Sequence, residues 1–145
     1  MIVPERLQRY SLFGGLLPDQ IDQILPHVIA GESYKAGENI IEEGSPNDRI
    51  HFILEGRVAV VKNGVTLAEL GEGDTFGEME VLDVMPSAAT ITALNETKAM
   101  SISNKALREI YKTDIHSFSL IIMNLARDLS RHLRRMNEKA TETLI

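Results

Sequence analysis

The 145 residues are enough for one domain with its own hydrophobic core, and 43% hydrophobic with 25% charged residues is typical of a folded globular protein. The sequence contains no cysteine, which excludes disulfides, thiolate metal sites and a catalytic cysteine. A net charge of −6 argues against a general nucleic-acid-binding surface. No secretory signal and no membrane-spanning apolar run is evident, so we expect a cytoplasmic protein that does not contact a membrane.

Residues 1–26 predict short N-terminal helices. Pro4 is favourable near a helix start, and Gly14-Gly15 predicts a break. Pro18-Asp19 opens a second predicted helix with an apolar face, and Pro26 is expected to end it.

Residues 27–103 predict a β-domain, because apolar runs become short and glycine recurs between them. Apolar and other residues alternate from Ile50 to Glu55, as in a half-buried strand. Asn63-Gly64 between two strand-like runs predicts a tight hairpin, since both residues tolerate positive φ. Ala88–Leu94 and Lys98–Ile102 are expected to be two closing strands.

Residues 104–139 predict C-terminal helices, with Ser103 or Asn104 as the N-cap and a long helix over Ile115–Asn137. Apolar residues recur on this helix at coiled-coil spacing, which predicts a homodimer through a seam formed by Ile122, Leu125, Leu129, Leu133 and Met136. The same helix carries a basic stripe, Arg127, Arg131, Arg134 and Arg135. This stripe is either a solvated face or a contact for an acidic protein partner.

A further stretch, residues 76–90, predicts an anion-binding loop. Gly77 precedes a short predicted helix, Glu78–Asp83, and the free N–H groups of a helix start favour an anion. Glycine permits a sharp turn and close approach of a ligand, and Glu78 supplies an acceptor for hydroxyl groups.

The residues Phe76-Gly77-Glu78-Met79, with Val81 and Leu82, followed by Pro86, Ala88, Ala89 and Thr90, resemble the phosphate-binding cassette of cyclic nucleotide-binding domains. This family includes the bacterial cAMP receptor proteins and the regulatory subunits of kinases. The resemblance covers nearly the whole chain, and we expect residues 1–145 to form a single domain. It implies a mainly β fold, a double-stranded β-helix (jelly roll) of two sheets, with flanking helices and a long C-terminal helix.

The resemblance implies a ligand pocket formed by Phe76, Gly77, Glu78, Met79, Ser87, Ala88, Ala89 and His132. In the family the glutamate holds the ribose 2′-hydroxyl and an arginine pairs with the cyclic phosphate. Ser87 stands in place of that arginine, so cAMP or cGMP is the expected ligand class but with weak or absent binding. Lys98 and Arg49 are candidates for a replacement cation.

The expected function is therefore a signalling domain that senses a ligand and has a degenerate phosphate site. A dimeric scaffold or protein-interaction module without a nucleotide, and a sensor of a different small anion, are the alternatives. We expect that the protein is not an enzyme, because no set of catalytic residues is identifiable in the sequence. We also expect no metal site, because the four histidines are not spaced as metal ligands are. Only Ala140–Ile145 follow the long helix, so we expect no helix-turn-helix module and no direct DNA binding.

Overall fold

The computed structural model describes residues 4–143, so the ends of the expected domain, residues 1–3 and 144–145, lie outside the described part. Its helices, including two 3-10 turns (η), are α1 Pro4–Leu7, η1 Ser11–Phe13, α2 Pro18–Ile24, η2 Leu25–His27, α3 Glu78–Asp83, α4 Asn104–Thr113 and α5 Ile115–Thr143. Its strands are β1 Val28–Tyr34, β2 Asn39–Ile41, β3 Arg49–Glu55, β4 Val58–Lys62, β5 Val65–Leu70, β6 Thr75–Phe76, β7 Thr90–Ala93 and β8 Thr97–Ser103. Within residues 4–143 no helix is both long and apolar enough to cross a membrane.

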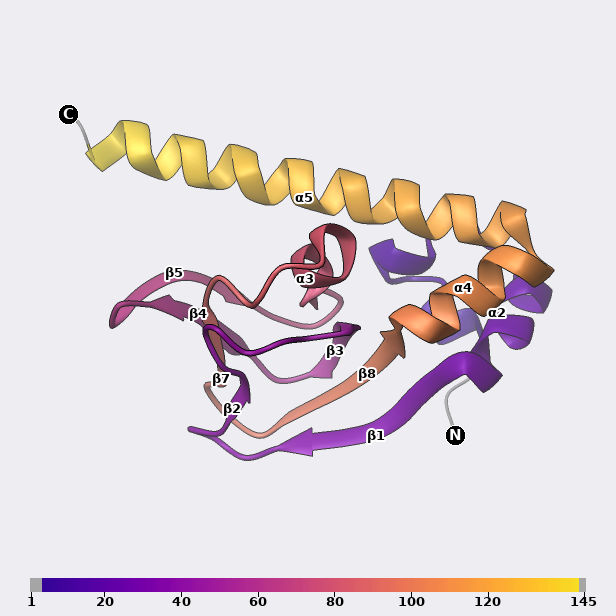
Figure 1. Ribbon diagram of the computed structural model, residues 1–145, viewed down its shortest axis with the longest axis horizontal. Coiled ribbons are helices and arrows are strands. Elements are labelled where there is room, and N and C mark those ends of the chain that lie inside the picture. Colours follow the sequence, from indigo (N-terminus) through magenta and orange to yellow (C-terminus); the bar gives the residue numbers. More distant parts are fainter. Residues whose placement is uncertain (1–3, 144–145) are drawn as a thin grey trace.

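The strands form two antiparallel sheets of four, in the orders β1-β8-β3-β6 and β2-β7-β4-β5. This arrangement, with α5 extending along one side, confirms the predicted double-sheet fold with a long C-terminal helix (Figure 1). The predicted hairpin is also confirmed: β4 and β5 pair across Asn63 and Gly64, whose φ values are 52° and 74°. A two-residue turn with positive φ at both positions has a twist that matches the right-handed twist of the flanking strands.

Three predicted boundaries differ from the structure. The strand expected at Ala88–Leu94 begins only at Thr90, because the chain before it is held by the β2–β3 loop, with the Ser87 amide donating to the Ser45 carbonyl. The helix expected to end at Asn137 continues to Thr143, since no glycine or proline interrupts it. The second N-terminal helix, which was expected to end at Pro26, ends at Ile24, and Pro26 lies within the 3-10 turn η2 that follows.

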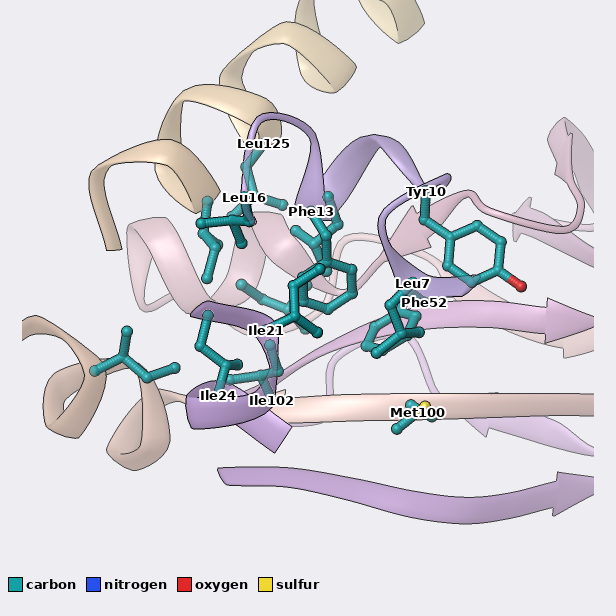
Figure 2. Packing of buried hydrophobic residues seen from close by; sticks show 14 of the residues in the cluster. Leu7, Tyr10, Phe13, Leu16, Ile21, Ile24, Phe52, Met100, Ile102 and Leu125 are labelled. Atoms are coloured by element: carbon teal, nitrogen blue, oxygen red, sulfur yellow. The ribbon is translucent and has the colours of Figure 1, made fainter. Parts of the chain in front are cut away.

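The main hydrophobic core lies between the first sheet and the helices. The alternation in β3 decides this, because Ile50, Phe52 and Leu54 face the helices while Ile53 faces the second sheet. Figure 2 shows the packing from both chain ends: Leu7, Phe13, Leu16 and Ile21 meet Phe52, Ile102 and Leu125. A smaller cluster fills the space between the sheets: Ile41, Ile53, Val58, Leu70, Phe76 and Ile91.

Helix α5 is attached to the domain along its first half. Ile121 and Leu125 are buried in the main core. The buried Asn124 amide donates to the Leu12 and Gly14 carbonyls at 3.0 and 2.9 Å. In Figure 1, α5 then continues past α3 toward the C-terminus, away from the N-terminal helices. The fold therefore places the predicted anion-binding loop beside the helix expected to mediate dimerisation.

Candidate functional site

Gly77 is the N-cap of α3, and its conformation, φ 82° and ψ 0°, is one that glycine adopts without strain. A Cβ at this position would lie 2.7 Å from the Arg49 carbonyl oxygen and 2.7 Å from Asn47 Nδ2. Glycine is required here because β3 and the loop before it lie so close to Gly77 that a side chain would clash with them. The sequence predicted the turn, and the structure shows what it packs against.

Asn47 fastens this turn to β3. Its Nδ2 donates to the carbonyl oxygens of Arg49, at 2.9 Å, and of Gly77, at 3.0 Å. The sequence analysis missed this role, because the residues that Asn47 joins are remote in the sequence and nothing local marks the bond. On its own, an asparagine followed by Asp48 favours a turn and indicates no partner elsewhere in the chain.

Glu78 is the first residue of α3, and its side chain is buried, with the residue 6% exposed. Burial raises the pKa of the Glu78 carboxyl to about 7, and the nearby carboxylates of Glu80 and Asp128 act in the same direction. Its own backbone N–H opposes this by stabilising the charged form. With a pKa of about 7, the carboxyl is divided between its protonated and ionised forms near neutral pH.

Asp128 on α5 is a second group at this site that the sequence analysis missed. It is 6% exposed and accepts hydrogen bonds from the Ser11 hydroxyl, at 2.9 Å, and from the Arg131 guanidinium. Its effect on the pKa of Glu78 means that α5 presents negative charge to the loop. Carboxylates therefore lie on two sides of Glu78, Glu80 on α3 and Asp128 on α5, and the charge of Asp128 is offset in part by Arg131.

Ser87, in the position of the expected arginine, is buried at 6% exposed. Its hydroxyl donates to the Ala89 carbonyl at 2.7 Å, its amide donates to the Ser45 carbonyl at 2.9 Å, and its carbonyl accepts from the Gly44 amide at 2.8 Å. Its N–H and O–H donors are thus directed to the protein's own backbone. Ser87 therefore uses both of its donors within the chain.

The remaining predicted pocket residues are divided between core and surface. Phe76 is 2% exposed and belongs to the cluster between the sheets. Met79 is 51% exposed, Ala88 is exposed, and Ala89 is half-buried. His132 is half-buried on α5, one turn beyond Asp128. Gly77, Glu78 and Ser87 are therefore buried, whereas Met79 and Ala88 are exposed to solvent.

The two candidate replacement cations have carboxylate partners of their own. Arg49 Nε lies 3.9 Å from Asp48 Oδ1, and Lys98 Nζ lies 3.9 Å from Glu55 Oε2. Two cavities, of about 520 and 400 Å³, lie elsewhere: Glu78 and Ser87 line neither of them. Among residues 4–143 no group of three histidine or carboxylate side chains is arranged to hold a metal ion.

The predicted dimer seam on α5 is partly used within the domain. Leu125 is 1% exposed and packs in the main core, whereas Leu133 and Met136 are 60% and 49% exposed. Ile122 and Leu129 are half-buried. The exposed part of the predicted seam therefore lies on the second half of α5.

The sequence of the chain is similar to known regulatory proteins. A family model described as the cyclic nucleotide-binding domain matches residues 31–114. A CRP-like cAMP-activated global transcriptional regulator of Mycobacterium tuberculosis is 29% identical, over 97% of this chain and 62% of the relative. A cyclic AMP receptor protein of Thermus thermophilus is 31% identical, over 85% and 57%. The chain therefore spans less than two thirds of the length of these relatives.

The fold is similar to that of solved structures as well. A cyclic nucleotide-binding domain from Methylobacillus flagellatus superimposes with a TM-score of 0.87, covering 97% of this chain and 82% of that one, at 23% identity. This likeness supports the fold, and the family match, which covers more than half of the chain, supports the kinship. Together with the Gly77-Glu78 turn, they show that the chain belongs to the cyclic nucleotide-binding domain family.

Proposed function

We propose that this chain is a regulatory sensor domain whose phosphate site is degenerate, so that it binds cAMP and cGMP weakly or not at all. The observation that carries the proposal is Ser87, which is buried with its hydroxyl and amide donating to the backbone where the family's arginine is expected. The intact Gly77-Glu78 turn supports descent from a nucleotide-binding site.

The electrostatics of the loop support the same conclusion. A cyclic phosphate carries one negative charge, and it would meet Glu78 with Glu80 and Asp128 nearby. A charge-assisted hydrogen bond contributes about 1.5–3 kcal/mol, so its loss weakens binding by roughly tenfold or more. Repulsion from the acidic groups increases that loss.

Isothermal titration calorimetry with cAMP and cGMP tests the proposal. We expect no binding in the micromolar range by the unchanged protein, and a gain of at least about tenfold in Ser87→Arg. Ser87→Ala is the matched control, because it removes the hydroxyl without adding a cation, and it should gain nothing.

Arginine at a buried position carries a risk of misfolding, so circular dichroism and the unfolding midpoint of Ser87→Arg are measured first. Ala88→Arg offers the cation one residue further on, at an exposed position. Micromolar binding by the unchanged protein would refute the degenerate site. Folded arginine variants that gain no affinity would show that the site has lost more than its cation, and would favour a function without a nucleotide.

Helix α5 is the proposed output element. Its exposed Leu133 and Met136 suit a homodimer contact, and its first half is anchored to the domain that carries the loop. A change at Glu78 would then reach the dimer helix through the neighbouring Asp128. The downstream partner in this proposal is a protein that reads the position or spacing of the paired helices.

The second candidate is a dimeric scaffold that binds a protein and no small ligand. The internal hydrogen bonds of Ser87 favour it, because they leave the loop complete without a ligand. The exposed Met79, on α3, and Met85, shortly after α3, add apolar surface for such a partner. A calorimetric result without nucleotide binding in either the unchanged protein or the arginine variants would support this candidate.

A further inference from the structure

The β2–β3 loop, residues 42–48, is hydrogen-bonded to both ends of the anion-binding loop, residues 76–90, and to the start of α4. At the far end of the anion-binding loop, the Gly44 amide donates to the Ser87 carbonyl at 2.8 Å, and the Ser87 amide donates to the Ser45 carbonyl at 2.9 Å. In Figure 1 the chain between β2 and β3 ends close to the start of α4. The β2–β3 loop therefore joins the candidate site to the C-terminal helices.

The contact at the near end of the anion-binding loop is made by the Asn47 side chain. Its Nδ2 donates to the Gly77 carbonyl at 3.0 Å and to the Arg49 carbonyl at 2.9 Å, while its Oδ1 accepts from the Arg49 amide at 3.3 Å. Gly77 is buried and Asn47 is half-buried, so water replaces these bonds poorly. The position of the Gly77 turn therefore depends on this one side-chain amide.

The contact at the start of α4 is made by the next residue, Asp48. Its carbonyl accepts from the Asn104 amide at 2.8 Å. Asn104 is the first residue of α4, after the N-cap Ser103, and its N–H is one of those that a helix start leaves without an internal partner. The Ala106 amide is satisfied differently, by the Ser103 hydroxyl at 3.0 Å. The first turn of α4 thus depends on the β2–β3 loop for one amide and on its own cap for another.

Helix α4 is joined to α5 by aromatic and core contacts. The rings of Tyr111 on α4 and Phe118 on α5 meet edge to face, with centroids 5.2 Å apart and an interplanar angle of 77°. Leu107 and Ile110 of α4 lie in the same core cluster as Ile121 of α5. Because side chains in a core are closely packed, a displacement of α4 changes the packing of α5.

We propose that Asn47 and Asp48 form a latch that couples the anion-binding loop to α4. The two residues are adjacent, so movement of Asn47 with Gly77 displaces the Asp48 carbonyl that holds the Asn104 amide. Whatever displaces the Gly77 turn then loosens the first turn of α4, and a partner that moves α4 loosens the Gly77 turn, because such coupling is reciprocal. The latch is separate from the contact between α3 and α5, and it does not depend on whether the loop binds a nucleotide.

The first test opens the loop end of the latch with Asn47→Ala and follows hydrogen exchange of single amides in ¹⁵N-labelled protein. The Asn104 amide should exchange at least about fivefold faster, because its acceptor is no longer held in place. The Ala106 amide is the internal control, since it is bonded to Ser103 in the same turn, and its exchange should not change. Equal acceleration of both amides would show a general loss of stability and would overturn the coupling, as would an unaltered Asn104 amide.

Asn39→Ala is the matched control variant. The Asn39 side chain also makes two hydrogen bonds, with Glu42 and Thr92, but among residues 4–143 it bonds to neither the anion-binding loop nor α4. This variant should leave exchange of the Asn104 amide unchanged, and an acceleration equal to that in Asn47→Ala would contradict the latch. Asn47→Asp keeps the side-chain oxygen but loses the donor, so it should accelerate exchange at least as much as Asn47→Ala.

The second test opens the α4 end of the latch with Asn104→Pro. Proline lacks the N–H that the Asp48 carbonyl accepts, yet it is favourable at the first position of a helix, so α4 itself is preserved. Asn104→Ala is the matched control, because it keeps the N–H. The side-chain amide protons of Asn47 should exchange with water at least about fivefold faster in Asn104→Pro and at the original rate in Asn104→Ala.

This second pair of variants decides the proposal by itself if Asn47→Ala does not fold. Faster exchange at Asn47 in Asn104→Pro alone would support the latch, because the perturbed amide and the reporting side chain lie at opposite ends of it. Unaltered exchange at Asn47 in folded Asn104→Pro, or an equal change in both variants, would overturn it.

Discussion

Glu78 gives the sharpest test of the electrostatics at the loop, through the substitution Glu78→Gln. The carboxyl has its pKa raised from 4.5 to about 7, chiefly by burial. A raised pKa in the folded protein means that the folded state holds its proton over a pH range in which the unfolded state has released it. The stability associated with this group is therefore complete below pH 4.5 and is lost as the pH rises to about 7.

The size of the effect follows from the shift. One pKa unit corresponds to about 1.4 kcal/mol, so the ionised Glu78 lowers the free energy of unfolding by up to about 3 kcal/mol above neutral pH. Glutamine keeps the shape and carries no charge. Glu78→Gln should accordingly be more stable than the unchanged protein by up to about 3 kcal/mol above pH 7, with a much smaller difference near pH 4.5.

Urea unfolding at several pH values measures this difference directly, since the free energy of unfolding is obtained at each pH from the same linear extrapolation. Glu69→Gln is the matched control, because Glu69 is exposed and pairs with Arg57 on the second sheet. Its difference from the unchanged protein should not vary with pH over this range. If the difference for Glu78→Gln were equally flat, the account of a buried, proton-holding carboxyl would be refuted.

Three further predictions concern the backbone and α5. Val84 has φ 58°, which strains a β-branched residue, and its side chain is 81% exposed. Val84→Asn should therefore raise the free energy of unfolding, measured with urea, by about 1 kcal/mol. A lower free energy of unfolding would contradict backbone strain at this position. Gly77→Ala should lower the free energy of unfolding by about 3 kcal/mol, because the added methyl group would clash with Arg49. Gly44→Ala, at nearly the same φ but with open space around it, should lower it by only about 1–2 kcal/mol. Equal losses in the two variants would rule out the contact with Arg49. Light scattering should find a dimer at tens of micromolar, and a monomer for Leu133→Asp, since Leu133 is 60% exposed; an unchanged protein that is monomeric there would end the dimer proposal.

Local sequence signals predicted those parts of the fold that depend on neighbouring residues. Asn63-Gly64 specified its hairpin because positive φ is a property of the two residues themselves. The helix at Glu78–Asp83 has the predicted bounds, and Ser103 caps α4 by accepting from the Ala106 amide at 3.0 Å. The two-residue strand β6 and the late start of β7 were not predicted, since both are set by pairing with distant strands and loops.

The candidate site divides in the same way. The motif located Gly77, Glu78 and Ser87 from their order in the chain. It did not reveal Asp128 near Glu78, the bonds from Asn47, or the stacking of His51 on Phe76, because each joins residues that only the fold brings together. The burial of His51 beside Glu32 became visible only with the structure.

The bonds from Asn124 to the carbonyls of Leu12 and Gly14 define how much of the chain makes up a folding unit. Both partners of this contact lie outside residues 31–114, the stretch that matches the family model. Leu12, Phe13 and Leu125 meet in the same core, so a fragment limited to the matched stretch would expose one face of the first sheet to water. An autonomous version of this domain must retain the N-terminal turn together with the first half of α5, and any linker or fusion should be attached outside both.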